Sequence, residues 1–122
     1  MLQSFPEGVR GILAHVGQAA IEVESGVNGF REFVTVYRCD TSRMTNFLQR
    51  FPYLSGESVV YRLMRFRVDA SVIENDSECS MEELIGLQSI YVPSEDAAIM
   101  ILDIWKVPAA SLLPPNQTTI PV

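Results

Sequence analysis

The sequence predicts a single α+β domain with a mostly antiparallel sheet of about four strands and helices packed on it. The chain has 122 residues, 48% of them hydrophobic, which suits one domain with a substantial core. Its apolar residues alternate between helical and strand periodicity, and an early hairpin pattern favours antiparallel pairing. We assign the domain to residues 1–107. Residues 108–122 hold four of the seven prolines and predict an extended tail, whose leucines could instead attach to the domain or to a partner groove.

A short helix is predicted over residues 4–16. Ser4 and Glu7 have the spacing of a capping box, in which two side chains satisfy the first amides of a helix. One helical face then carries apolar residues at the i, i+3, i+4 and i+7 positions: Val9, Ile12, Leu13 and Val16.

A β-hairpin follows over residues 18–39. Residues 18–24 alternate between apolar and polar side chains, which is typical of a half-buried strand. Residues 25–29 contain two glycines and an asparagine, and residues 30–39 are rich in β-branched and aromatic side chains.

A second helix is predicted over residues 41–51, capped by Asp40 or Thr41 and ended by Pro52. Its apolar face, which we expect to be buried against the sheet, consists of Met44, Phe47, Leu48 and Phe51.

The second half of the chain predicts two strands and two helices. Residues 58–68 are apolar on both faces, as in a central strand, and residues 87–92 could form a fourth strand. A capping-box pattern predicts a short helix over residues 80–86. Residues 94–106 carry start and stop signals of a helix, although their apolar run would also suit a buried strand; we favour the helix.

Composition also indicates a compartment. No apolar run approaches 18 residues, so we expect no membrane span, and the first residues do not resemble a signal peptide. The two cysteines are then expected to be reduced thiols in a cytoplasmic protein, with Cys39 acting as a small buried side chain and Cys79 lying among acids.

The net charge of −6 is unevenly distributed: residues 1–68 carry +2 and residues 69–122 carry −8. Net acidity argues against nucleic-acid binding, which depends on phosphate neutralisation. Either the arginines of residues 62–67 pair with acids of the second half, the interpretation we favour for those arginines, or the acids face a basic partner.

No motif predicts a catalytic, cofactor or metal site. His15 is the only histidine, which excludes a histidine-rich metal cluster, and no nucleophile elbow or phosphate-binding loop occurs. The acidic stretch at residues 74–83 fails as an EF-hand loop in both registers tested, because the required glycine and the final acid are missing.

These observations are most consistent with a small acidic protein-binding module that masks or scaffolds a partner, in the manner of immunity proteins, inhibitors, adaptors or chaperones. The alternative is a small enzyme or ligand-binding domain with a site between sheet and helices. We expect a protein partner, which could present a basic surface, and neither nucleic acid nor a membrane. The predicted partner-binding residues are Asp76, Glu78, Glu82 and Glu83.

The acidic surface can be tested by reversing two of its charges together, Asp76→Lys and Glu78→Lys. If these residues face a partner, the free energy of unfolding should change by less than about 0.5 kcal/mol. The association rate with a basic partner should fall, and wild-type binding should weaken with added salt. Lower stability with unchanged association would instead show that the acids pair within the domain.

Overall fold

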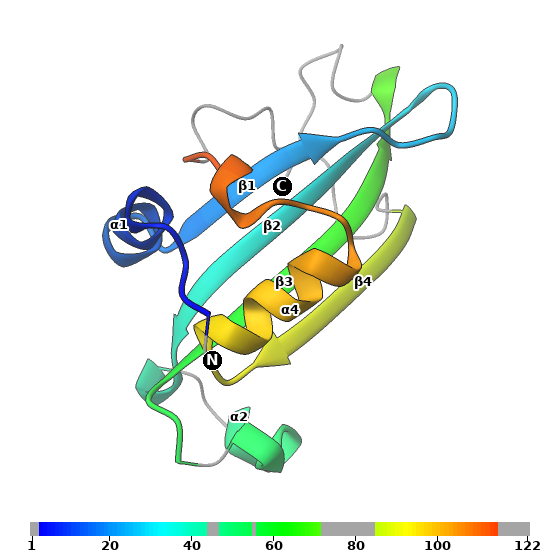
Figure 1. Ribbon diagram of the computed structural model, residues 1–122. Coiled ribbons are helices and arrows are strands. Elements are labelled where there is room, and N and C mark those ends of the chain that lie inside the picture. Colours follow the sequence, from blue (N-terminus) through cyan, green and yellow to red (C-terminus); the bar gives the residue numbers. More distant parts are fainter. Residues whose placement is uncertain (1–2, 44–46, 55, 72–84, 115–122) are drawn as a thin grey trace.

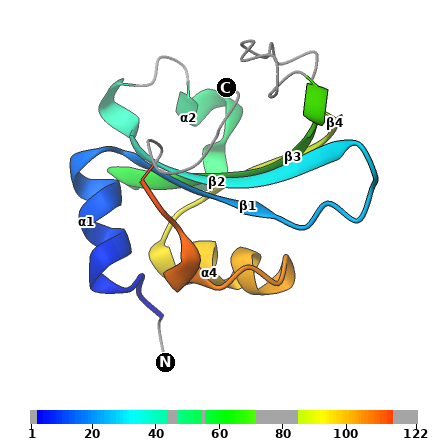
Figure 2. The same ribbon diagram turned by 90° about the horizontal axis from the view of Figure 1, so that it is seen from above.

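The computed structural model describes residues 3–43, 47–54, 56–71 and 85–114, with Phe47 and Leu48 described by their backbone alone. These residues form one antiparallel sheet with helices α1 and α4 on the same face (Figures 1 and 2). The predicted α+β architecture is therefore confirmed.

The sheet is a simple meander in which each strand pairs with the next along the chain. Its spatial order is β1-β2-β3-β4, and all three pairings are antiparallel. The predicted hairpin forms, and its turn places Gly26 and Gly29 at positive φ, a conformation that glycine adopts without strain. The strand predicted to be central is an interior strand. The strands are β1 (Gln18–Val23), β2 (Phe30–Asp40), β3 (Val59–Asp69) and β4 (Ile85–Val92).

Helix α1 spans Glu7–His15 and packs through Val9 and Leu13, which are buried. The predicted capping box does not form, because the helix begins after Pro6 and no side chain caps it. Val16 follows the last turn and is exposed, so it does not extend the buried face as predicted.

Acidic residues of α4 hold the segment before α1. Helix α4 spans Glu95–Ile104. The Phe5 amide donates to Glu95 Oε1 at 3.2 Å, and the Gln3 amide donates to Asp96 Oδ1 at 2.8 Å. These long-range bonds fix the segment before α1 to α4, whereas no side chain caps α1 itself.

The helix predicted over residues 94–106 is confirmed in preference to the strand. The hydroxyl of Ser94 accepts a hydrogen bond from the Ala97 amide at 3.1 Å, which is an N-cap interaction. The core-facing side of α4 carries Ala98, Ile99 and Leu102, all buried against the sheet.

The helix predicted over residues 41–51 is much shorter in the structure. Thr41–Arg43 forms one 3-10 turn, because the carboxylate of Asp40 accepts hydrogen bonds from the amide and hydroxyl of Ser42. Helix α2 spans only Phe47–Arg50. Of the predicted apolar face, Phe51 is half-buried in a cluster with Leu54, Val60 and Tyr91; Met44 and the side chains of Phe47 and Leu48 lie outside the described residues.

Gly86 does not end a helix, as the sequence predicted, but lies within β4. Its φ of +66° accompanies a register shift between Arg65 and Arg67 of β3, which marks a bulge in the β3–β4 ladder. The remainder of the predicted helix, residues 80–84, lies outside the described residues.

The first residues of the predicted tail pack against the domain. A 3-10 turn spans Ala109–Ser111, and Leu112 is buried in the core beneath the helices. Leu113 exchanges two backbone hydrogen bonds with Ala20 on the outer edge of β1, at 2.9 and 2.8 Å. The leucines of this segment therefore attach to the domain; residues 115–122 lie outside the described residues.

A buried carboxylate ties β2, β3 and α4 together. Glu32 of β2 is 5% exposed and pairs with two arginines of β3: Arg65, and Arg67 at 3.2 Å. Arg65 also donates to the carbonyl oxygen of Trp105 at the end of α4, at 2.9 Å. Strand register places Glu32, an acid of the first half, beside Arg65 and Arg67. The acids between residues 74 and 83 lie outside the described residues, so the expected pairing of these arginines with acids of the second half stays a prediction.

Replacing Arg65 by methionine should lower the free energy of unfolding by about 2–4 kcal/mol, because Glu32 would stay buried with half of its charge compensation. The matched control is Arg10→Met, which breaks the exposed Arg10–Glu95 pair and should cost less than about 1 kcal/mol. Urea denaturation measures both. Equal small losses would show that the Glu32 cluster does not stabilise the fold.

Candidate functional site at the β4 edge

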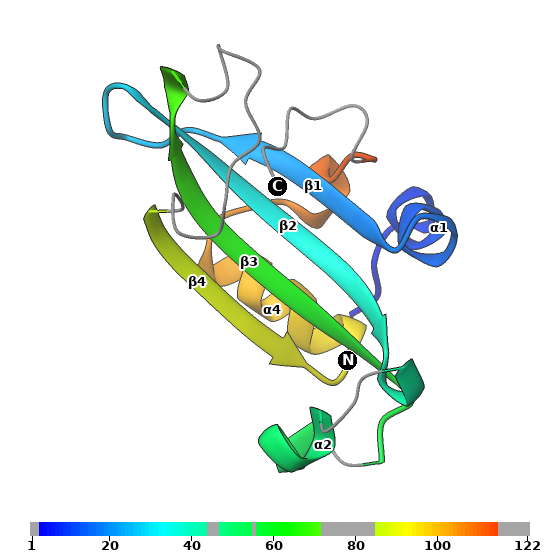
Figure 3. The same ribbon diagram turned by 180° about the vertical axis from the view of Figure 1, so that it is seen from behind.

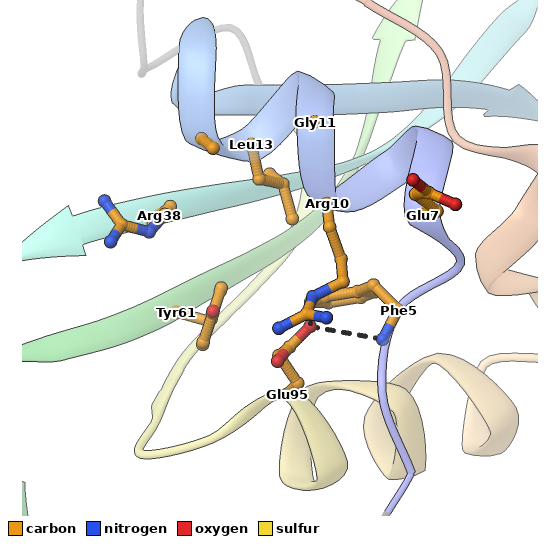
Figure 4. Close-up of a pocket in the computed structure, with 9 residues that line it drawn as sticks. Phe5, Glu7, Arg10, Gly11, Leu13, Arg38, Tyr61 and Glu95 are labelled. Carbon is orange, nitrogen blue, oxygen red and sulfur yellow. Dashed lines mark hydrogen bonds and ion pairs between the residues drawn. The ribbon is translucent and has the colours of Figure 1, made fainter.

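A hollow of about 470 Å³ lies between α1, the sheet and the start of α4 (Figure 4). Arg10 and Glu95 line it and form an ion pair of 3.1 Å, and the rings of Phe5 and Tyr61 meet edge to face. Burial, with a smaller contribution from Glu95, raises the pKa of the Tyr61 hydroxyl. Glu95 also accepts a hydrogen bond from the Phe5 amide. Beside this hollow, Glu95 therefore joins the N-terminal segment to α4.

The two outer strands of the sheet differ in how they are protected. The outer edge of β1 is partly covered by Leu113, and the exposed pair Arg31–Glu22 places charges beside it. Strand β4 has no second neighbour among the described strands. An uncovered edge presents unpaired backbone groups that can hydrogen-bond another extended chain.

The composition of β4 makes this edge unusual. The sequence of Ile85–Val92, IGLQSIYV, contains no charged residue and no proline, two of the devices that block an edge. A third device, the bulge at Gly86, is confined to the start of the strand. Ile85, Leu87 and Ile90 are 46%, 41% and 38% exposed. Among the described residues this edge is therefore apolar and pairs with no further strand.

A second hollow, of about 450 Å³, adjoins this edge on the face opposite α4. The short α2 segment lies next to the end of β4 there (Figure 3). The lining combines aromatic rings, two arginines and a hydroxyl, contributed mainly by Arg50, Phe51, Tyr53, Arg62, Ser89 and Tyr91.

The aromatic rings of this second hollow, which we call the arginine hollow, are held by one another. Phe51 lies 4.9 Å from Tyr91 and 6.2 Å from Tyr53, measured between ring centroids. The hydroxyl of Tyr53 donates to the carbonyl oxygen of Tyr91 at 3.0 Å. The α2 segment is thus fixed to the end of β4.

Arg62 extends from β3 across to the edge strand. Its guanidinium carbon lies 5.6 Å from the Tyr91 ring centroid, and its Nε donates to Ser89 Oγ at 3.1 Å. Arg50 lies over Phe51 at 5.6 Å. In the part of the chain that the structure describes, no acidic side chain forms an ion pair with Arg50 or Arg62.

The partner-binding residues predicted from sequence, Asp76, Glu78, Glu82 and Glu83, lie outside the described residues, so their role stays a prediction. His15 is exposed at the end of α1 and lines none of the hollows described above. The described residues contain no group of three or more His, Cys, Asp or Glu side chains suited to a metal ion. No described helix is long and apolar enough to cross a membrane.

Sequence reasoning missed the β4 edge and the arginine hollow. The sequence shows three arginines in the strand at 62–67, but not that they divide between two faces of the sheet. Arg65 and Arg67 meet Glu32 beneath α4, whereas Arg62 meets Tyr91 on the other face. The signal for the edge was the uncharged run of residues 85–92.

No family model matches this chain, and comparison with curated proteins and with solved structures finds no match either. The functional argument therefore rests on the geometry of the site.

Cys39 lies beside the Phe51–Tyr91 cluster, is half-buried and carries a free thiol. Burial raises the pKa of this thiol, and the nearby Arg62 charge partly opposes that effect. In a Cys79→Ser variant, Cys39 should react with iodoacetamide several-fold more slowly at pH 8 than an unstructured cysteine peptide does. Adding Arg62→Gln should move the pH midpoint of the reaction still higher; a midpoint below that of the peptide would contradict the described surroundings.

Proposed function

We propose that this chain is a protein-binding module that masks or scaffolds its partner by accepting an extended segment of it at the outer edge of β4. The observation that carries the proposal is an eight-residue edge strand with no charge, no proline and three exposed aliphatic side chains. Recognition by strand addition draws its affinity from main-chain hydrogen bonds and its selectivity from side-chain pockets.

The difference between the two edges supports the choice of β4. Natural sheets protect edges that have no role, and here β1 is partly covered by Leu113 and carries the charged side chain of Glu22. An edge strand that lacks such protection can pair with another chain. We infer that the edge of β4 is unprotected because a partner strand binds there.

Exposed apolar residues on α4 extend the surface beyond the strand itself. Met100 and Ile104 are one helical turn apart, and both are exposed. A partner that adds a strand to β4 could also contact α4, which lies over β3 and β4 (Figure 1). Burial of these side chains would add hydrophobic stabilisation to the backbone hydrogen bonds.

The proposal can be tested with a phage-displayed library of random 12-residue peptides selected on the immobilised chain. Enriched peptides should alternate apolar and polar residues, and their binding should slow amide hydrogen exchange within β4. Leu87→Lys should weaken binding by at least about tenfold, because a lysine on the edge opposes strand addition.

Val16→Lys is the matched control, since Val16 is 58% exposed and lies at the end of α1, away from β4. It should leave binding unchanged, and thermal unfolding should confirm that both variants are folded. A selection that enriches no peptide contradicts the proposal. The proposal is also contradicted if Leu87→Lys leaves the peptide affinity unchanged, or if the bound peptide slows amide exchange in α1 and not in β4.

A further inference from the structure

We propose that the arginine hollow receives an acidic side chain of the segment that pairs with β4, so that Arg50 and Arg62 select an aspartate or glutamate at one fixed position of the partner. This inference rests on the proposed strand addition and names the chemistry that it recognises.

The first step of the argument is charge. In a chain of net charge −6, Arg10, Arg31, Arg65 and Arg67 all form ion pairs with glutamates. Four arginines, Arg38, Arg43, Arg50 and Arg62, have no such pair among the described residues. Arg38 and Arg43 share their hollow with Asp40. Arg50 and Arg62 border a hollow of about 450 Å³ that no described acid lines. Two cations at one hollow repel each other, and a carboxylate between them would relieve that repulsion.

The second step is reach. A side chain directly opposite a β4 residue on an added strand lies about 5 Å from it, on the same face of the sheet. Arg62 starts on β3, but its contacts with Tyr91 and Ser89 carry the guanidinium across to β4. An acidic residue placed opposite Ser89 or Tyr91 is therefore within reach of a charge-assisted hydrogen bond.

The third step concerns the class of ligand, a peptide carboxylate or a nucleotide base. Single-stranded nucleic acids and nucleotides bind through exposed ring faces on which a base can stack. Here Phe51 packs against Tyr91 and Tyr53, and both Phe51 and Tyr91 carry an arginine above the ring. Two of the three rings thus carry an arginine, and the Tyr53 ring, which is 63% exposed, is the one that a base could contact. The two guanidinium groups at one hollow favour a small carboxylate over a planar base.

The experiment uses the tightest acidic peptide from the display selection and a second peptide with that acid changed to its amide. The wild-type chain should bind the acidic peptide about tenfold to a hundredfold more tightly, the range for a charge-assisted hydrogen bond. Arg62→Gln and Arg50→Gln should each remove most of this preference, and added salt should reduce it.

Arg43→Gln is the control, because it removes the same charge from an exposed residue outside the hollow. It should leave the preference intact. Arg50 is exposed on α2, so Arg50→Gln keeps the test valid should Arg62→Gln disturb the packing over Tyr91.

This inference would be overturned if the selected peptides bind at β4 without a preferred acidic residue and with the same affinity for Arg50→Gln and Arg62→Gln. The proposed function would then still stand. Loss of all peptide binding in Leu87→Lys together with an intact acid preference in the wild type supports both. Binding of ATP alone that disappears in Arg62→Gln, without acid selection in peptides, would assign the hollow to nucleotides and overturn the inference.

Discussion

The buried carboxylate of Glu32 is the interaction on which most of this structure depends. A carboxylate that is 5% exposed must be compensated, and Arg65 and Arg67 do this only when β2 and β3 pair in the observed register. A shift by one residue would turn every side chain of the strand to the other face. Arg65 also donates to the carbonyl of Trp105, the residue that follows α4, so the same cluster fixes the end of that helix over the sheet.

The register set by this cluster also creates the candidate site. Strand residues alternate between the two faces of the sheet, so Arg62 lies on the face opposite Arg65 and Arg67. There Arg62 contacts Tyr91 and Ser89 of β4. One strand therefore supplies two arginines for stability and one for the arginine hollow. Leu113 closes part of the far edge at β1, which leaves β4 as the exposed edge among the described strands.

The charged residues of this protein would act on a partner over two different distances. The described residues carry all nine basic side chains and ten of the fifteen acidic ones, so that part of the chain is nearly neutral. The other five acids lie between residues 74 and 83. A dense acidic segment would steer a basic partner over about a Debye length, whereas Arg50 and Arg62 would act by contact. A partner with a basic surface and one acidic residue in its pairing segment satisfies both requirements.

The sequence by itself determined the α+β class, the hairpin, the interior strand and helix α4, because local periodicity and caps such as Ser94 report local structure directly. The sequence did not predict the long-range bonds by which Glu95 and Asp96 hold the segment before α1, because the partners lie about 90 residues apart. It also did not predict that Asp40 would bond Ser42 and form a 3-10 turn where the helix over 41–51 was expected to begin. Tertiary structure alone decided which described strand has only one neighbour and which arginines pair with described acids. Both depend on strand order and register, which bring residues far apart in the sequence into contact and leave no local pattern to read.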